Sequence, residues 1–308
     1  MNVYELCFSP TGGTRKVSRC LANALSPDPV FVDLTDRKED FSLRTFSPED
    51  LCIAAVPSYG GRVPAPAADR LLAMKGQGAR VVLLAVYGNR DYDDTLLELD
   101  EVTREAGFVP VAGVAAVAEH SIVRAFGQGR PDEADREALA SFAETILARL
   151  DQDDLTLSLP GKRPYVDYHG VPMKPAAGEA CTGCGACAKN CPVGAIPEET
   201  PAETDQAVCI SCMRCVARCP KKARTIGEAA LAGAAQMLQK VCSGRKPNQL
   251  FLIPAPAGEK REKGGVPCEA AEKEDPPESG GIHSDPGHSG GLFCGDYGHP
   301  AAGAGKAG

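Results

Sequence analysis

Eight cysteines between residues 181 and 219 carry the strongest chemical signal in this sequence of 308 residues. They lie in two stretches, CTGCGACAKNCP and CISCMRCVARCP, which share the spacing C-x-x-C-x-x-C-x-x-x-C-P. Three thiolates in one tight loop can bind three irons of a cubane, whereas the fourth cysteine lies too far along its own stretch and crosses to the other cluster. Structural zinc sites instead separate two C-x-x-C pairs by a longer spacer. The pattern therefore favours two iron–sulfur clusters over zinc.

This region resembles the two-cluster bacterial ferredoxins across about residues 175–227. The resemblance implies two 4Fe–4S clusters and divides the eight cysteines between them. The first cluster takes Cys181, Cys184, Cys187 and Cys219, and the second takes Cys209, Cys212, Cys215 and Cys191. Small residues between the cysteines would let backbone N–H groups approach the sulfurs and tune the reduction potential.

A second group of chemically useful residues follows the first apolar run of the chain. Residues 3–8 (VYELCF) predict a buried strand, and residues 17–25 place apolar side chains on one face of a helix. Between them lies SPTGGT, residues 9–14. A strand, a Gly/Thr-rich turn and a helix aim backbone N–H groups and hydroxyls at a phosphate. The loop is neither a Walker A sequence nor G-x-G-x-x-G, which disfavours ATP and dinucleotides.

The elements that must position this loop alternate along the first half of the chain. Further strands are predicted at residues 30–34, 51–56, 80–87 and 108–118. Helices are predicted at residues 65–74, 95–106 and 132–150. Five strands that alternate with helices predict an α/β fold, a five-stranded parallel doubly wound sheet with ligands at the carboxyl ends of its strands.

Three loops lie at those carboxyl ends, at residues 9–14, 57–64 (PSYGGRVP) and 87–94 (YGNRDYDD). The first loop matches the flavodoxin phosphate loop, [Ser/Thr]-x-Thr-Gly-x-Thr, at Ser9, Thr11, Gly12 and Thr14, so the domain resembles flavodoxin. The resemblance implies that residues 9–15 hold the phosphate of FMN and that the other two loops bracket its isoalloxazine ring.

The predicted FMN contacts are therefore residues of these three loops. They are Ser9, Thr11, Gly12, Gly13, Thr14, Arg15, Pro57, Ser58, Tyr59, Gly60, Gly61, Tyr87, Gly88, Asn89 and Tyr92. Tyr59 and Tyr92 are the candidates for stacking on the ring. Many flavodoxins use a tryptophan there, and this chain has none. His120 also follows a predicted strand at the ligand edge, where a solvated or capping role is favoured over a catalytic one.

The composition divides the chain into five segments. Four prolines between residues 160 and 175 break any helix or central strand, which predicts an extended connector. We expect a flavodoxin-like FMN-binding domain at residues 1–155, a linker at 156–174, a small α+β ferredoxin domain at 175–227, and a helix with a short extended segment at 228–253. Residues 254–308 are rich in glycine and proline, a composition typical of disorder.

The overall composition excludes several classes of function. A net charge of −8 argues against a nucleic-acid partner, because phosphate binding needs a basic surface. No apolar run approaches the roughly 20 residues that a membrane span needs, and the N-terminus lacks the features of a signal peptide. We expect a cytoplasmic protein in which the 14 cysteines bind metal or stay free rather than form disulfides.

Residues 1–253 together resemble the bacterial flavodoxin–ferredoxin fusion proteins. The resemblance implies electron transfer between FMN and two 4Fe–4S clusters in one chain, with a ferredoxin-like or other low-potential redox protein as partner. Two alternatives stay open: an FMN-dependent reductase of a quinone or similar small molecule, with the clusters as electron feeders, and a redox sensor. The residues do not decide whether the protein is an enzyme, and they assign no catalytic residue.

Overall fold

The computed structural model describes residues 1–150 and 157–252. All of these residues belong to one compact unit, Met1–Ala257. The expectation of disorder for residues 254–308 lies outside the described residues.

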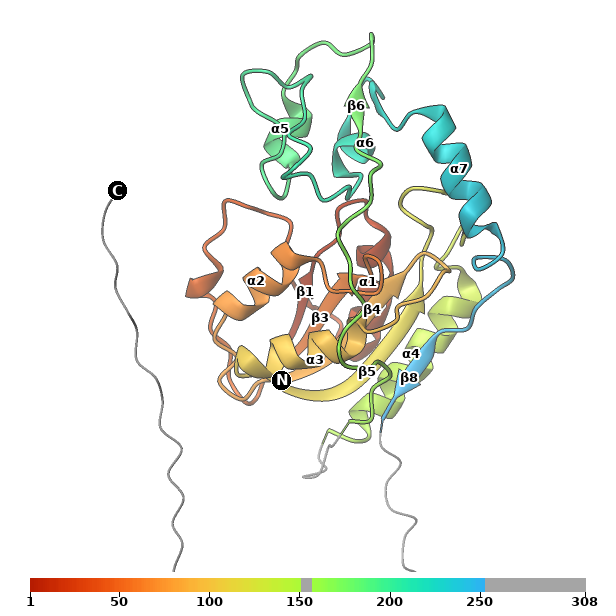
Figure 1. Cartoon of the computed structure of the whole chain (residues 1–308). Helices are drawn as coiled ribbons and strands as arrows, with labels where there is room; N and C mark the ends of the chain where they lie inside the picture. Colours follow the sequence, from red (N-terminus) through yellow and green to blue (C-terminus); the bar gives the residue numbers. More distant parts are fainter. Residues whose placement is uncertain (151–156, 253–308) are drawn as a thin grey trace, which may run out of the picture. The chain divides into compact units, whose positions relative to one another are not determined.

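The first domain is built on a sheet of five parallel strands (Figure 1). They are β1 (Val3–Cys7), β2 (Val30–Asp33), β3 (Leu51–Pro57), β4 (Arg80–Tyr87) and β5 (Val109–Val117). Their spatial order is β2-β1-β3-β4-β5, which is the flavodoxin-like doubly wound order. The predicted fold is confirmed, and the chain reverses direction across β1 and β3, where such sheets bind ligands.

A sixth strand, β8 (Gln249–Phe251), adds to the sheet beside β5 in the antiparallel direction. The sequence predicts only a short extended segment here, because three residues are too few to show a period. The C-terminal segment thus returns to the first domain, and the sheet has six strands in place of the five expected.

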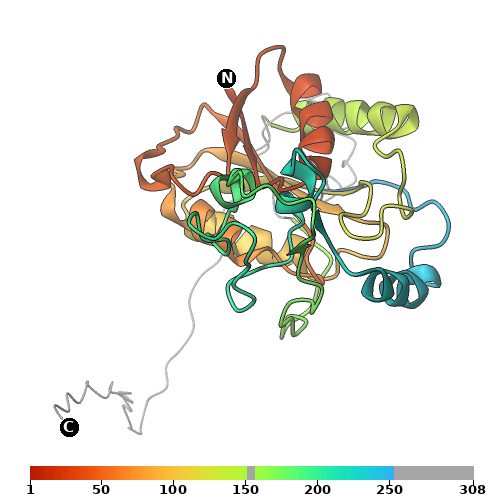
Figure 2. The ribbon, with the colours of Figure 1, turned by 90° about the horizontal axis from the view of Figure 1, so that it is seen from above.

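Helices cover both faces of the sheet (Figure 2). Helix α1 (Gly13–Leu25) packs against α4 (Glu133–Leu147), and α2 (Ala65–Ala73) packs against α3 (Thr95–Glu105). Successive residues of β4 point to opposite faces, so that Leu83 joins the core beneath α2 and α3 whereas Leu84 joins the core beneath α1 and α4. Burial of each such leucine contributes about 1.5–3 kcal/mol. A short 3-10 helix, η1 (Phe41–Leu43), precedes β3.

The cysteine-rich region forms two short helices joined by loops. They are α5 (Ala186–Asn190) and α6 (Arg214–Arg218), which pack against each other. Strands β6 (Ala176–Ala177) and β7 (Arg224–Thr225) pair antiparallel at the ends of the region. Helix α7 (Glu228–Gln239) follows and contacts the loop after β5, where Ala234 packs near Val123 and Phe126. None of the helices in the described ranges is long and apolar enough to cross a membrane.

The connector between the two regions runs along the first domain. Residues 157–174, all of which the structure describes, contain no helix or strand. Leu159 packs against the core beneath α2 and α3, and the backbone N–H of Lys162 donates to Asp94 over 2.9 Å. The ring of Tyr168 covers Gly60, where an added Cβ would lie 2.1 Å from the ring. The connector is therefore held to the first domain by contacts along its length.

Candidate cofactor sites

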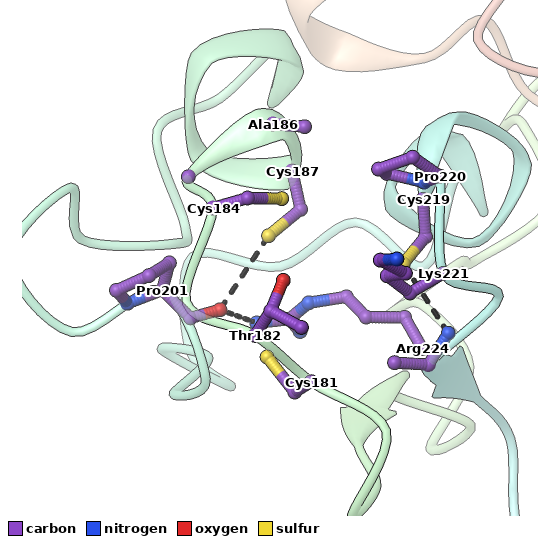
Figure 3. A pocket seen from close by; sticks show the side chains of 12 residues that line it. Cys181, Thr182, Cys184, Ala186, Cys187, Pro201, Cys219, Pro220, Lys221 and Arg224 are labelled. Atoms are coloured by element: carbon purple, nitrogen blue, oxygen red, sulfur yellow. Dashed lines mark hydrogen bonds between the residues drawn. The ribbon is translucent and has the colours of Figure 1, made fainter.

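The eight cysteines of the two repeats separate into two sets of four, each around its own cavity. One cavity is lined by Cys181, Cys184, Cys187 and Cys219 (Figure 3). The other is lined by Cys191, Cys209, Cys212 and Cys215. Each set combines three cysteines of one repeat with the fourth cysteine of the other. The fold therefore brings together the same sets that the ferredoxin resemblance implies.

The loops hold the sulfurs in similar surroundings in both repeats. The N–H of Ala195 donates to the sulfur of Cys191 over 3.3 Å, and the N–H of Ala223 donates to the sulfur of Cys219 over 3.2 Å. Across residues 1–150 and 157–252, no three His, Cys, Asp or Glu side chains converge on a single-ion site, which is the arrangement that zinc needs. Four thiolates around a larger space, with N–H groups on the sulfurs, are the donor set of a 4Fe–4S cluster.

The two cavities differ in how strongly they exclude water. Burial raises the pKa of Cys212 to about 12 and that of Cys215 to about 11. At Cys219, hydrogen bonds from four backbone N–H groups outweigh the burial, and the pKa of this thiol is lowered. Cys184 of the first cavity is exposed, whereas each cysteine of the second is buried or partly buried, so the second cavity is the more shielded from water.

A third cavity, with a volume of about 60 Å³, lies at the carboxyl ends of the parallel strands. Gly12 precedes α1 with a φ of 92°, and the first turn of that helix contains no acidic residue and no side-chain cap. The hydroxyl of Ser9 accepts a hydrogen bond from the N–H of Arg15 over 2.9 Å and so closes the loop. The free N–H groups at this helix end suit an anion.

Eight of the fifteen predicted FMN contacts line this third cavity. They are Thr11, Gly13, Thr14, Pro57, Ser58, Tyr59, Tyr87 and Gly88. Ser9, Gly12 and Arg15 belong to the same loop but do not line the cavity. The guanidinium of Arg15 instead lies 3.5 Å over the ring of Phe31.

The other four predicted contacts are engaged by the protein itself. Asn89 donates to the carbonyls of Cys242 and Gly244 over 2.6 and 2.8 Å, and the hydroxyl of Tyr92 donates to Gln249 over 2.9 Å. Gly60 lies under Tyr168, and an added Cβ at Gly61 would lie 2.5 Å from the carboxylate of Asp93. The connector and the C-terminal segment therefore occupy the outer parts of both ring loops. These contacts are long-range, so no local sequence pattern could show them.

The loop after β5 supplies lining residues that the predicted set of contacts lacks. They are Ala118, Glu119, His120 and Ser121. The Nδ1 atom of His120 accepts hydrogen bonds from the N–H groups of Ile122 and Val123 over 3.1 and 3.0 Å, as the expected capping role requires. Burial and the nearby Arg90 lower the pKa of this imidazole, so it is neutral at pH 7 and carries its hydrogen on Nε2. The only sequence signal for this residue is its position after the fifth strand.

A fourth cavity, with a volume of about 580 Å³, adjoins the third and extends from the phosphate loop to the second repeat. The two cavities share Thr11, Gly13, Glu119, His120 and Ser121. Its opposite wall is formed by Met213, Val216, Ala217, Cys219 and Lys222. Space at the phosphate loop is thus continuous with space at the cysteine-rich region.

Direct contacts also join both cysteine repeats to the first domain. The guanidinium of Arg70, on α2, donates to the carbonyl of Pro192 over 2.5 Å. The guanidinium of Arg214 lies 3.4 Å from the carbonyl oxygen of Ser9. Burial raises the pKa of Tyr59 well above 10, and the nearby Cys212 and Tyr168 add to this rise. Tyr59 thus lines the third cavity and lies near a cysteine of the second repeat.

Comparison with known proteins identifies the cysteine-rich region. Residues 174–224 match a family model described as a 4Fe-4S dicluster domain. A stretch of 55 residues is 47% identical to one subunit of the ion-translocating oxidoreductase complex of Methanosarcina acetivorans. This match covers 18% of the chain and 21% of the relative, so the chain spans only about a fifth of that protein's length.

Solved structures similar to the chain include flavodoxins. The flavodoxin of Streptococcus pneumoniae TIGR4 is 21% identical, with a TM-score of 0.35, over 48% of this chain and 99% of its own. Flavodoxin 2 of Bacillus cereus is 16% identical, with a TM-score of 0.37, over 48% and 99%. Rubredoxin oxygen:oxidoreductase of Desulfovibrio gigas is 18% identical, with a TM-score of 0.36, over 48% and 36%. The strand order of the first domain defines the fold independently of these scores. Residues 174–224 therefore form a 4Fe–4S dicluster domain, joined in one chain to an N-terminal domain of flavodoxin-like fold.

Proposed function

We propose that this protein is an iron–sulfur flavoprotein that moves electrons between FMN and two 4Fe–4S clusters. The carrying observation is the fourth cavity, which adjoins the third and extends from the phosphate loop to the second cysteine repeat. Electron transfer needs short distances between cofactors, and cofactors held at the two ends of this cavity would lie close together within a single chain. The match to a 4Fe-4S dicluster domain supports the iron–sulfur half of the proposal.

The residues present fit the clusters. Cys181, Cys184, Cys187 and Cys219 would hold one, and Cys191, Cys209, Cys212 and Cys215 would hold the other. Buried Arg224 donates to three backbone carbonyls and one hydroxyl, and no carboxylate lies among these partners. Its uncompensated positive charge lies at the first cavity and would offset the negative charge of four thiolates and their cluster.

The third cavity fits FMN at its phosphate end. Thr11, Gly13 and Thr14 would contact the phosphate through hydroxyl and N–H groups, which is the chemistry of an uncapped helix start. Tyr59, Tyr87 and Gly88 would contact the ring, together with the cavity wall at His120. Because Asn89, Tyr92, Gly60 and Gly61 are engaged elsewhere, we propose that the ring extends toward the fourth cavity rather than between the two loops.

Bound FMN would supply an acceptor of one or two electrons, and each cluster a carrier of one. The role of the polypeptide is to hold these groups at a fixed separation and to keep water from the drier cluster site. One wall of the fourth cavity belongs to each domain, so no diffusional encounter is needed for the internal step. A redox protein such as a ferredoxin would exchange electrons with the exposed side of the dicluster domain, where Cys184 is exposed.

Anaerobic reconstitution of the full chain with iron, sulfide and FMN tests this proposal. We expect about eight irons and one FMN per chain. In stopped-flow experiments, electrons should pass between clusters and flavin at a rate independent of protein concentration. A chain that holds only four irons, or that binds no flavin, would contradict the proposal.

A pair of tyrosine variants tests where the ring lies. Tyr59→Leu should weaken FMN binding, measured by quenching of flavin fluorescence, because Tyr59 lines the third cavity. Tyr92→Leu should lower stability and leave FMN affinity unchanged, because Tyr92 packs against Tyr87 and Phe251 outside the cavity. If instead Tyr92→Leu weakens FMN binding and Tyr59→Leu does not, the flavin ring lies between the two loops.

The size of the fourth cavity favours a second candidate, an FMN-dependent reductase of a small molecule. Lys16 and Lys222 lie on its wall with the neutral His120, so an anionic or quinone-like acceptor could enter beside the flavin. Steady-state reduction of such acceptors by the reconstituted protein, driven by reduced ferredoxin, would support this candidate. If the protein exchanges electrons with ferredoxin but reduces no small acceptor, the result contradicts the reductase candidate and supports the electron-carrier function.

A further inference from the structure

Arg214 lies between two cysteines of the second repeat, yet its side chain extends out of the dicluster domain. The residue is 7% exposed. Its Nη1 atom lies 3.4 Å from the carbonyl oxygen of Ser9 and 3.5 Å from that of Pro10. Its Nη2 atom lies 3.7 Å from the carboxylate of Asp33, at the end of β2. A cation of the cluster loop is therefore buried against the phosphate loop of the other domain.

The cluster loop itself does not need this side chain. The equivalent position of the first repeat is Ala186, which also begins a five-residue helix, and both repeats place their cysteines around a cavity. Arginine at this position is thus not required by the fold of the repeat. Its burial is costly unless its partners compensate, and those partners lie in the first domain.

The contact with Pro10 controls the direction of a neighbouring N–H group. The bond from Pro10 to Thr11 is trans, so the Pro10 carbonyl and the Thr11 N–H point in opposite directions. Because the Pro10 carbonyl points toward Arg214, the Thr11 N–H points away from Arg214. Thr11 itself lines both the third and the fourth cavity. The distances from Nη1 of Arg214 to the two carbonyl oxygens are long for hydrogen bonds. Electrostatic attraction between the guanidinium and the two carbonyl dipoles therefore supplies most of the interaction energy.

We propose that Arg214 is a positioning residue of the FMN phosphate site, contributed by the dicluster domain. It holds the phosphate loop with its N–H groups directed at the ligand. Because Arg214 adjoins Cys215, it is in place only when the second cluster site is formed, and FMN binding becomes linked to assembly of that cluster. This inference rests on the proposed function, since it concerns how the same FMN site is organised.

The substitution Arg214→Ala tests the inference, since it copies the residue of the first repeat. In cluster-loaded protein, its FMN dissociation constant should rise about tenfold, as expected for the loss of a charge-assisted contact. Its dissociation constant for riboflavin, which lacks the phosphate, should match that of the wild type. Arg218→Ala is the matched control, because Arg218 is an exposed arginine on the same helix, and it should bind both flavins as the wild type does.

Two outcomes of this titration would overturn the inference. One is an FMN dissociation constant in Arg214→Ala within twofold of the wild type. The other is an equal loss for FMN and riboflavin, which would mean a general structural role. If the wild-type protein binds neither flavin, the proposed function itself fails, and this result is distinct from both.

Cysteine variants test the linkage to one particular cluster. Cys209→Ser removes a residue of the second cavity and should weaken FMN binding, whereas Cys184→Ser removes a residue of the first cavity and should not. By reciprocity, FMN should reduce the fraction of iron that a chelator removes at equilibrium from Cys184→Ser more than from Cys209→Ser. Equal FMN affinity in the two variants would contradict the linkage.

Discussion

The two cysteine repeats share a backbone and differ in the side chains placed on it. The first repeat, with the loop just after it, has glycine at three left-handed positions, Gly183, Gly185 and Gly194, with φ of 67°, 71° and 71°. The equivalent residues of the second repeat are Ser211, Met213 and Lys222, with φ of 54°, 61° and 51°. A side chain at such a position costs about 1 kcal/mol or more relative to glycine. The second repeat, with the loop just after it, therefore contains three residues with a strained backbone.

Each of these three side chains either contacts a residue outside its own repeat or lines a cavity. The hydroxyl of Ser211 donates to the carbonyl of Val171 in the connector over 3.2 Å. Met213 lines both the second and the fourth cavity, and Lys222 lines the fourth. Backbone strain is often retained where a side chain has a function. The difference teaches that both repeats contact the first domain, since the carbonyl of Pro192 accepts from Arg70, but that the second repeat also places strained side chains on the wall of the fourth cavity.

The largest expected effect tests whether the repeats exchange a cysteine. Cys191 belongs to the first repeat by sequence but lines the second cavity. Cys191→Ser and Cys212→Ser should therefore lose the same cluster, with iron falling from about eight to about four per chain. Their low-temperature EPR spectra should match each other and differ from that of Cys187→Ser. Matching spectra for Cys191→Ser and Cys187→Ser would show that each repeat keeps its own four cysteines.

A second prediction concerns the buried residues that follow each repeat. Arg224 is 1% exposed and occupies the position of Ile196, which is 3% exposed. Arg224→Leu removes the donor to three backbone carbonyls and should destabilise the cluster-loaded protein by about 3 kcal/mol, because buried acceptors lose their partner. Ile196→Val should cost only about 1 kcal/mol. Chemical unfolding followed by circular dichroism measures both, and equal costs would show that Arg224 merely fills space.

Exchanging the left-handed residues gives a smaller effect. An added Cβ at Gly185 meets no atom within 4 Å, so Gly185→Ala should cost only the backbone strain, about 1 kcal/mol. The unfolding midpoint should fall without loss of either cluster. A midpoint equal to that of the wild type would mean that the left-handed positions carry no measurable strain.

The smallest expected effect has the opposite sign. Lys222 is exposed, so Lys222→Gly should relieve strain and raise stability by up to about 1 kcal/mol. The same change removes a positive charge from the fourth cavity, and binding of an anionic acceptor there should weaken at low ionic strength. A variant less stable than the wild type would show that the lysine stabilises the fold, and the comparison of the repeats would need another cause.

The alternation of strands and helices, the phosphate loop and the cysteine spacing follow from the sequence alone. Each depends on residues close together in the chain, such as the apolar run of β4 or the hydroxyls of residues 9–14. Periodicity and spacing of this kind reflect local geometry, which a fold must obey wherever the segment lies. The five parallel strands were predictable for this reason.

Only the tertiary structure decided which distant surfaces meet. In the folded chain, Tyr92 and Asn89 donate hydrogen bonds to the C-terminal segment, β8 joins the sheet, and Arg214 lies against the phosphate loop. These contacts join residues more than 130 positions apart, and neither partner has a local pattern that identifies the other. The sequence therefore determined the two modules, whereas packing between them determined which residues are left to bind a cofactor, because a side chain already engaged in the fold cannot also contact a ligand.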